Sequence, residues 1–181
     1  MTRLRFARDG YILISILFYI TAVCYMALPA LPPMWLCWIS GGILIAYGII
    51  KIVGFFAKDL YCLAFQDDLA LGILMLILGV GLLVFNLRVA DFIPVGVGWL
   101  ALLDSLFKVQ MSRDAKSFGL RQWKVILGVG ILTAVLSVVL IFFCPPSTTF
   151  GHYITGAVLV AEGVMNHCVV LLTVKRMTNE T

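Results

Sequence analysis

Six long apolar runs dominate the pattern of hydrophobic and polar positions along this chain. They cover residues 11–28, 35–57, 69–87, 92–110, 123–144 and 152–174. Each run has about 18 to 23 residues, and a helix rising ~1.5 Å per residue then crosses ~30 Å of hydrocarbon. The runs do not alternate with a period of two, and open sheet edges cannot face lipid. The pattern therefore predicts an all-α polytopic membrane protein with six transmembrane helices.

The composition indicates the same class of protein. Of the 181 residues, 62% are hydrophobic, and the mean hydropathy is +1.09. So few polar residues cannot coat a soluble globule. The formal charge is +4, but no segment interleaves basic and aromatic residues as a nucleic-acid-binding surface would. We expect one membrane domain, residues 1–181, which contacts the lipid bilayer and no nucleic acid. Association with a second copy or with another membrane protein stays open.

Basic residues are distributed unevenly over the connections between the runs. Ten lie in the N-terminal segment, the second and fourth connections and the C-terminal segment, whereas the other three connections hold only Arg88. The positive-inside bias then predicts that both termini are cytoplasmic. The first run is longer than the apolar part of a usual secretory signal, and further runs follow it, so we expect a retained first helix.

One sequence pattern occurs three times. Residues 41–51 read GGILIAYGIIK, residues 98–108 read GWLALLDSLFK and residues 156–166 read GAVLVAEGVMN. The starting glycines are separated by 57 and then 58 positions. Because each unit contains two crossings, successive units enter the membrane in the same direction. We predict three parallel two-helix hairpin repeats, residues 11–57, 69–110 and 123–174, related by an axis along the membrane normal.

The three copies align two sets of polar positions. One set is Tyr47, Asp104 and Glu162, and the other, four residues later, is Lys51, Lys108 and Asn166. Residues at i and i+4 share a helix face. We therefore predict that the second helices of the hairpins meet around an axis and stack these sets as two polar layers about 6 Å apart. Two carboxylates and two ammonium groups would then neutralise each other.

Two alternatives remain open for these polar positions. The lysines lie close enough to the cytoplasmic end for their ammonium groups to extend to the membrane surface. A buried network, in turn, would serve either to specify the fold or as a proton or ion relay with Glu162 as the exchangeable group. Asp67 or Asp68, just ahead of the third helix, is expected to cap its N-terminus.

Glycines recur at a spacing of seven, which is about two helical turns. The pairs are Gly41 and Gly48, Gly72 and Gly79, and Gly156 and Gly163. Such spacing produces a narrow stripe of small residues along which membrane helices approach closely.

The sequence holds no motif of a known catalytic or nucleotide-binding site. His152 and His167 are expected at different depths and on different faces, and the five cysteines show no C-x-x-C spacing. We expect neither a metal site nor a cofactor, and no enzymatic activity.

Three segments carry a family resemblance: PPMWLCWISGGILIAYGIIKI, IPVGVGWLALLDSLFKV and PPSTTFGHYITGAVLVAEGVMNH. They resemble the repeat of the HdeD-like family of bacterial acid-resistance membrane proteins, over residues 11–174. The middle copy departs from the pattern, because Ser105 replaces the glycine found at Gly48 and Gly163 and its turn lacks proline. The resemblance implies a small protein of the bacterial cytoplasmic membrane that serves stress or acid tolerance, structurally or through partners, and it supplies no catalytic residues. The alternative is a small proton- or ion-linked channel or transporter that uses the polar layer around Glu162.

Overall fold

The computed structural model describes residues 2–27, 32–56, 68–119, 122–144 and 148–171, and within them it contains helices and no strand. The elements are α1 (Thr2–Ala27), α2 (Pro33–Phe56), α3 (Asp68–Val89), the short 3-10 helix η1 (Ala90–Phe92), α4 (Ile93–Ser117), α5 (Trp123–Phe143) and α6 (Thr149–Val169). Each predicted apolar run overlaps one α-helix, and residues 28, 57 and 172–174 of these runs lie outside the described residues. The prediction of an all-α polytopic membrane protein is confirmed.

Five helices, α1 to α5, are long and apolar enough to cross a membrane. Helix α6 is as long as α5, with 21 residues, but polar side chains such as Glu162 and Asn166 lower its hydropathy. These two side chains are 4% and 0% exposed. Because α6 packs against α1, α4 and α5, its polar residues face protein rather than lipid, and a lower hydropathy is tolerated.

Two helices extend beyond their apolar runs toward the same end of the bundle. Helix α1 begins at Thr2, ahead of the run that starts at residue 11, and α4 continues to Ser117, past the end of its run at residue 110. Helix α4 then ends on Gly119, which has a φ of +73°. This left-handed conformation is the usual glycine termination of a helix. At the other end of the bundle, the Thr148 side chain caps α6 by accepting a hydrogen bond from the Gly151 N–H at 3.1 Å.

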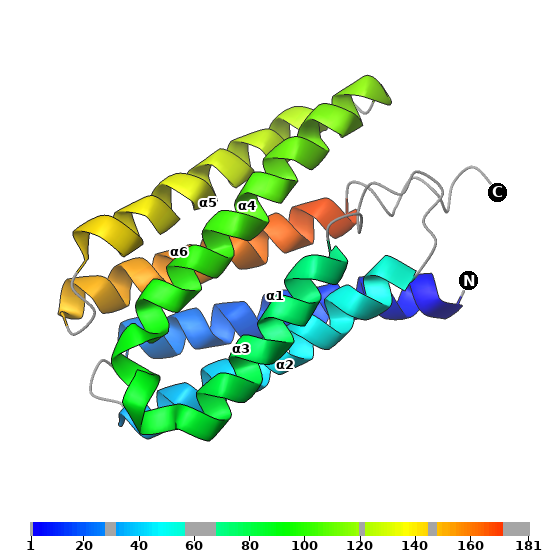
Figure 1. Ribbon diagram of the computed structural model, residues 1–181. Helices are drawn as coiled ribbons and strands as arrows, with labels where there is room; N and C mark the ends of the chain where they lie inside the picture. The colour runs from blue at the N-terminus through cyan, green and yellow to red at the C-terminus, as the bar shows by residue number, and fades with distance from the viewer. Residues whose placement is uncertain (1, 28–31, 57–67, 120–121, 145–147, 172–181) are drawn as a thin grey trace.

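The six helices form an antiparallel bundle built from three closely packed pairs (Figure 1). The most extensive packing joins α2 with α3, α4 with α5, and α6 with α1. The second helix of each hairpin thus packs on the first helix of the next, and α6 closes the arrangement on α1. Helices α3 and α4, although consecutive, meet mainly through η1 at their connection and diverge from there in Figure 1.

The glycines of α2 and α3 lie directly against one another. A Cβ atom on Gly48 would lie 2.7 Å from the carbonyl oxygen of Gly72, and one on Gly79 would lie 3.0 Å from that of Gly41. Carbon and oxygen atoms cannot approach so closely without a shift of the backbone. Glycine at these positions therefore allows the two helices to pack in backbone contact.

Small residues in the same register join α6 to α1. A Cβ atom on Gly156 would lie 3.1 Å from the carbonyl oxygen of Ala22, and one on Gly163 would lie 3.2 Å from that of Ser15. Ser15 and Ala22 precede the α3 glycines by 57 positions each. The repeat therefore extends to the first helices of the hairpins.

Helices α4 and α5 repeat this arrangement with serine in two of the four places. Gly130 packs near Ser105, since its Cβ atom would lie 3.6 Å from the Ser105 carbonyl oxygen. Ser137 is 0% exposed. Gly130 and Ser137 follow the α3 glycines by 58 positions each. All three helix pairs thus use small residues at matching positions, in support of a third repeat.

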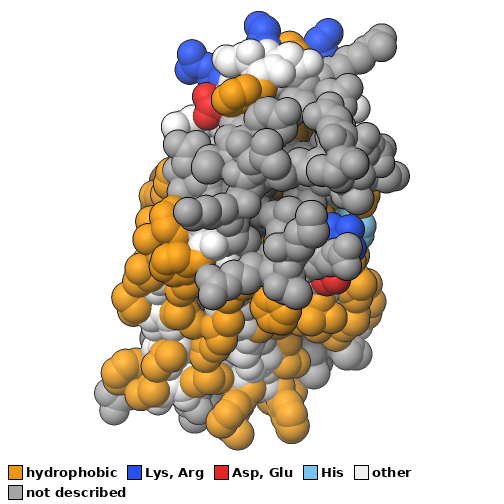
Figure 2. Space-filling view, turned by 90° about the vertical axis from the view of Figure 1, so that its right-hand side faces the viewer, with side chains coloured by type: hydrophobic (Ala, Val, Ile, Leu, Met, Phe, Trp, Pro, Cys, Tyr) orange, Lys and Arg blue, Asp and Glu red, His pale blue; other side chains and the backbone are white. Residues whose placement is uncertain are grey.

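The outer surface suits a lipid environment. Large apolar side chains such as Val84, Phe142 and Phe143 are between 66% and 73% exposed. Figure 2 shows apolar side chains over the left and lower parts of the visible face, with most of the visible lysine and arginine side chains at the upper edge and another beside a histidine at the right. Soluble monomers rarely expose apolar surface on this scale, and we conclude that the helices are embedded in a bilayer.

Candidate functional site

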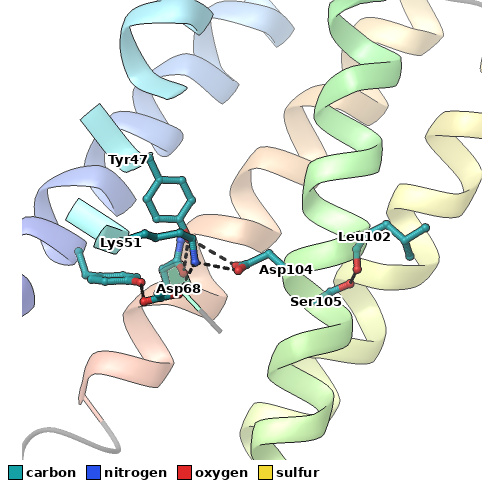
Figure 3. A network of polar contacts seen from close by, with 8 residues as sticks. Tyr47, Lys51, Asp68, Leu102, Asp104 and Ser105 are labelled. Carbon is teal, nitrogen blue, oxygen red and sulfur yellow. Dashed lines mark hydrogen bonds and ion pairs between the residues drawn. The ribbon is translucent and has the colours of Figure 1, made fainter. Parts of the chain in front are cut away.

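Lys51 of α2 is the centre of a buried polar cluster. Its side chain is fully buried, and its Nζ atom lies 2.8 Å from Asp68 Oδ1 on α3 and 2.8 Å from Asp104 Oδ1 on α4 (Figure 3). Both carboxylates are buried as well. An ammonium group in an apolar interior needs such compensation, because leaving water is costly for a charge. The two contacts tie the first predicted repeat to both helices of the second.

Two tyrosines surround the ammonium group. The Lys51 Nζ atom lies 4.7 Å from the centre of the Tyr47 ring and 5.6 Å from that of Tyr11, within cation–π range. The Tyr11 hydroxyl donates a hydrogen bond to Asp68. The Tyr47 hydroxyl donates to Asn166 Oδ1 at 2.9 Å and lies 3.4 Å from Asp104 Oδ2. Asn166 thereby connects α6 to the cluster.

Lys108 is adjacent to the cluster without an ion pair inside the described part of the chain. Its side chain is 4% exposed, and its Nζ atom lies 5.9 Å from the centre of the Tyr11 ring. In the sequence, Lys108 follows Asp104 by four positions, which is about one helical turn. The Asp104 carboxylate is nevertheless directed at Lys51, and neither lysine extends to the surface.

Glu162 of α6 is the unpaired member of the group. It is 4% exposed, and neither carboxyl oxygen accepts a hydrogen bond from an N–H or hydroxyl donor of the described residues, although the Asp104 carboxyl lies within hydrogen-bond reach. Its charged neighbours are Asp104, Lys51 and Lys108. Asp68 adds a third carboxyl to the two that were expected, so the two lysines leave one acidic group without a counter-charge. Within the described residues, Glu162 is the carboxyl of the three that has no ion pair with a lysine.

A cavity of about 430 Å³ extends from Glu162 and Tyr47 toward the end of the bundle where Tyr25 and Ser40 lie. Its walls are almost entirely apolar side chains of α1, α2, α3, α4 and α6. At the far end, the Tyr25 hydroxyl and the Ser40 hydroxyl lie 3.5 Å apart. The cavity therefore reaches Glu162 from one end of the bundle.

The structure brings all six predicted polar residues into one region. Tyr47, Lys51, Asp104 and Asn166 are linked by hydrogen bonds, and Lys108 and Glu162 lie beside them. The Tyr47–Asp104 contact lies within one predicted layer, whereas the two shorter contacts cross between the layers. Lys51 reaches Asp104, and Tyr47 reaches Asn166, because these side chains are long enough to span one helical turn.

Two members of the cluster, Tyr11 and Asp68, did not emerge from the sequence. Asp68 was expected to cap the N-terminus of the third helix. It is the first residue of α3, but its carboxylate binds Lys51 and Tyr11 in the core. Asp67, the other capping candidate, lies outside the described residues. Tyr11 and Asp68 are 57 positions apart, as are Tyr47 and Asp104. The repeat period applied to the first helices would have identified the pair.

The remaining candidate ligands are scattered. In the described segments, no three His, Cys, Asp or Glu side chains converge as a metal site would require. His152 lies 6.0 Å from the ring centre of Tyr25, and the Nδ1 atom of half-buried His167 has no hydrogen-bond partner there. The described cysteines, Cys24, Cys37, Cys144 and Cys168, are free thiols, and Cys62 lies outside the described residues.

Comparison with protein families matches one model, described as a short repeat of unknown function (DUF308), at residues 13–67 and again at residues 70–129. The first copy covers the first predicted hairpin, and the second covers α3, α4 and the start of α5. Neither curated proteins nor solved structures give a significant match. Because the two copies together cover more than half of the residues, this chain belongs to the family defined by that repeat.

Proposed function

We propose that the protein is a non-enzymatic integral membrane protein of the bacterial plasma membrane, whose buried polar cluster holds its hairpins in one arrangement. We further propose that it serves stress or acid tolerance, structurally or through partner proteins. The observation that carries the structural part is the position of Lys51, fully buried and 2.8 Å from carboxylates of two other helices. The resemblance to HdeD-like proteins supports the stress role.

The structural role follows from the energetics of buried charge. A buried ion pair adds little net stability, since desolvation offsets most of the attraction, but removing one partner is costly. Lys51 is compensated only when Asp68 and Asp104 both face α2. Arrangements in which the second repeat is shifted along or rotated against the first leave an uncompensated charge in the bundle and are disfavoured.

The proposed topology places both termini in the cytoplasm. Exposed basic residues support it: Arg113 and Lys116 at the end of α4 and Lys124 at the start of α5 lie at one end of the bundle. Helix α1 begins and α6 ends at this same end (Figure 1). Such clustering agrees with the positive-inside bias.

Glu162 favours a second candidate function, proton- or ion-linked transport. An ionisable residue within a membrane bundle is commonly part of an ion pathway, and Glu162 is a buried carboxyl at the foot of a cavity, without an ion pair to a lysine of the described residues. Against transport, the cavity that the described residues outline extends from Glu162 toward one end of the bundle, and its lining does not include Lys51, Asp68 or Asp104.

Proton flux into proteoliposomes separates the two candidates. The structural proposal predicts that flux with the intact protein equals flux with Glu162→Gln and with empty vesicles. Flux that requires the protein and is abolished by Glu162→Gln, but not by the exposed control Asp91→Asn, would establish transport instead. Survival of cells after acid challenge, compared between the intact protein and Lys51→Met, tests the stress role, and equal survival of cells with and without the gene would contradict it.

A further inference from the structure

The cavity beside Glu162 has the dimensions of a ligand site. Its volume of about 430 Å³ falls within the ~300–1,000 Å³ typical of small-molecule pockets. Its walls are apolar, and among the described residues that line it Glu162 alone carries a carboxyl group. Lys51, Lys108 and Asp104 do not belong to the lining, since they lie deeper in the bundle. A ligand in this cavity therefore meets one acidic group at the end of a long apolar space.

The chemistry of Glu162 defines the head of that ligand. A buried polar group without a hydrogen-bond partner costs about 1–3 kcal/mol. No N–H or hydroxyl donor of the described residues reaches either Glu162 oxygen, and the neighbour within hydrogen-bond reach is another carboxyl, that of Asp104. The two buried lysines are outnumbered by three buried carboxyls. The missing partner is thus a donor or a cation. An anionic head is disfavoured, because it would meet Glu162, which already has the Asp104 carboxyl as a close neighbour.

The surroundings of the cavity define how a ligand enters. Three of the side chains that line it, Ile77 and Phe85 on α3 and Phe92 on η1, are between 56% and 66% exposed, so the cavity is open on that side. Helices α3 and α4 are both apolar enough to cross a membrane, and the opening between them faces acyl chains. Gly81 and Gly96 widen the space, because a Cβ atom on either would meet nothing within 4 Å.

We propose that this cavity binds a single-chain amphiphile with a primary amine head, which enters sideways from the bilayer. The chain lies along the apolar walls, and the nitrogen contacts the Glu162 carboxyl. The amine enters neutral, and its lone pair accepts the carboxyl proton, so that an ammonium–carboxylate pair forms without any other bond changing. The inference rests on the cavity and on Glu162, and it is independent of the proposed role in stress tolerance.

Native mass spectrometry of the purified full chain, titrated with dodecylamine, dodecanol or dodecanoate, tests the head-group preference. We expect one dodecylamine per protein and at least ~10-fold weaker binding of dodecanoate, in line with a charge-assisted hydrogen bond. Glu162→Gln should weaken dodecylamine binding by a similar factor and leave dodecanol binding unchanged. Equal binding of dodecylamine and dodecanoate, or dodecylamine binding that is unchanged in Glu162→Gln, would overturn the proposal.

A second pair of variants tests the location without touching the carboxyl. Gly96→Leu places a side chain into the open cavity and should reduce dodecylamine binding at least ~10-fold. Gly128→Leu is the matched control, because Gly128 is exposed on α5, outside the lining, and its Cβ atom also meets nothing within 4 Å. Equal dodecylamine binding by both variants would refute the site. The proposed occupant would be wrong if a two-chain phospholipid bound to the protein, was lost in Gly96→Leu and was not displaced by dodecylamine.

Discussion

Replacing Lys51 by methionine should destabilise the protein more than any comparable change at the surface. Methionine keeps the length and apolar stem of lysine but leaves the Asp68 and Asp104 carboxylates buried together without their shared cation. Each contact is 2.8 Å long, and at an effective dielectric of ~20 its gross Coulomb attraction is about 6 kcal/mol. Desolvation of the three charges offsets most of this attraction. Removing one partner of a buried pair typically costs about 3–5 kcal/mol, and we expect a loss of that size in the free energy of unfolding.

The assay is unfolding in dodecylmaltoside micelles titrated with sodium dodecyl sulfate, followed by circular dichroism. Lys124→Met, at an exposed site, should stay within about 0.5 kcal/mol of the unmodified protein. A triple variant that also carries Asp68→Asn and Asp104→Asn should recover most of the loss, since it removes the two buried charges that Lys51→Met leaves uncompensated. A cost below about 1 kcal/mol for Lys51→Met alone would refute the view that these carboxylates depend on Lys51.

Two further changes test the packing and the polar link to α6. Gly48→Ala should destabilise the protein by about 1–3 kcal/mol through overpacking against the Gly72 carbonyl. Gly42→Ala is the control, because its Cβ would meet nothing within 4 Å, and it should be neutral or stabilising in the same assay. Equal effects of the two changes would argue against backbone contact between α2 and α3. Tyr47→Phe removes the hydroxyl that binds Asn166. It should lower the free energy of unfolding by about 0.6–1.7 kcal/mol, between the average and the maximum measured for hydrogen bonds between membrane helices. An unchanged free energy of unfolding would show that this bond contributes little to stability.

Much of the fold follows from the pattern of apolar residues. Runs long enough to span a bilayer must be helical there, so the number and order of the helices could be predicted from hydropathy alone. The start of α1 and the end of α4 could not be predicted in this way. There the helix continues beyond the apolar run and carries polar residues such as Arg8 and Arg113. Hydropathy indicates where a helix leaves the hydrocarbon, but it does not indicate at which residue the helix itself ends.

Six members of the candidate site were predicted from the sequence, whereas Tyr11, the role of Asp68 and the connections between the side chains were not. The repeat period identified Tyr47, Asp104 and Glu162 as equivalent positions, and equivalence places them at similar depth. It does not determine which side chains bond, because that depends on reach across helices. Asp68 shows the limit most clearly: at the start of a helix an aspartate is usually a cap, and only the packing of α3 on α2 directs this one at Lys51.

The sequence pattern likewise did not predict which helices pack against each other. Short turns suggest that the two helices of a hairpin pack mainly on each other, yet the closest packing joins neighbouring hairpins, with α6 closing on α1. The glycine stripes explain this preference, because Gly41 and Gly48 fit against Gly79 and Gly72 in backbone contact. No comparable stripe joins α3 to α4, and there the cavity opens.

The most direct test is a double-mutant cycle between Lys51 and Asp104, with Lys51→Met, Asp104→Asn and the double variant compared in the unfolding assay. If repeated hairpins turn their charges toward one another, the two changes should be strongly non-additive, with a coupling energy above about 1.5 kcal/mol, as expected for residues in one buried ion-pair network. Additivity within about 0.5 kcal/mol would show that the two side chains do not interact in the folded protein, and the account of an inward-facing polar core would be wrong.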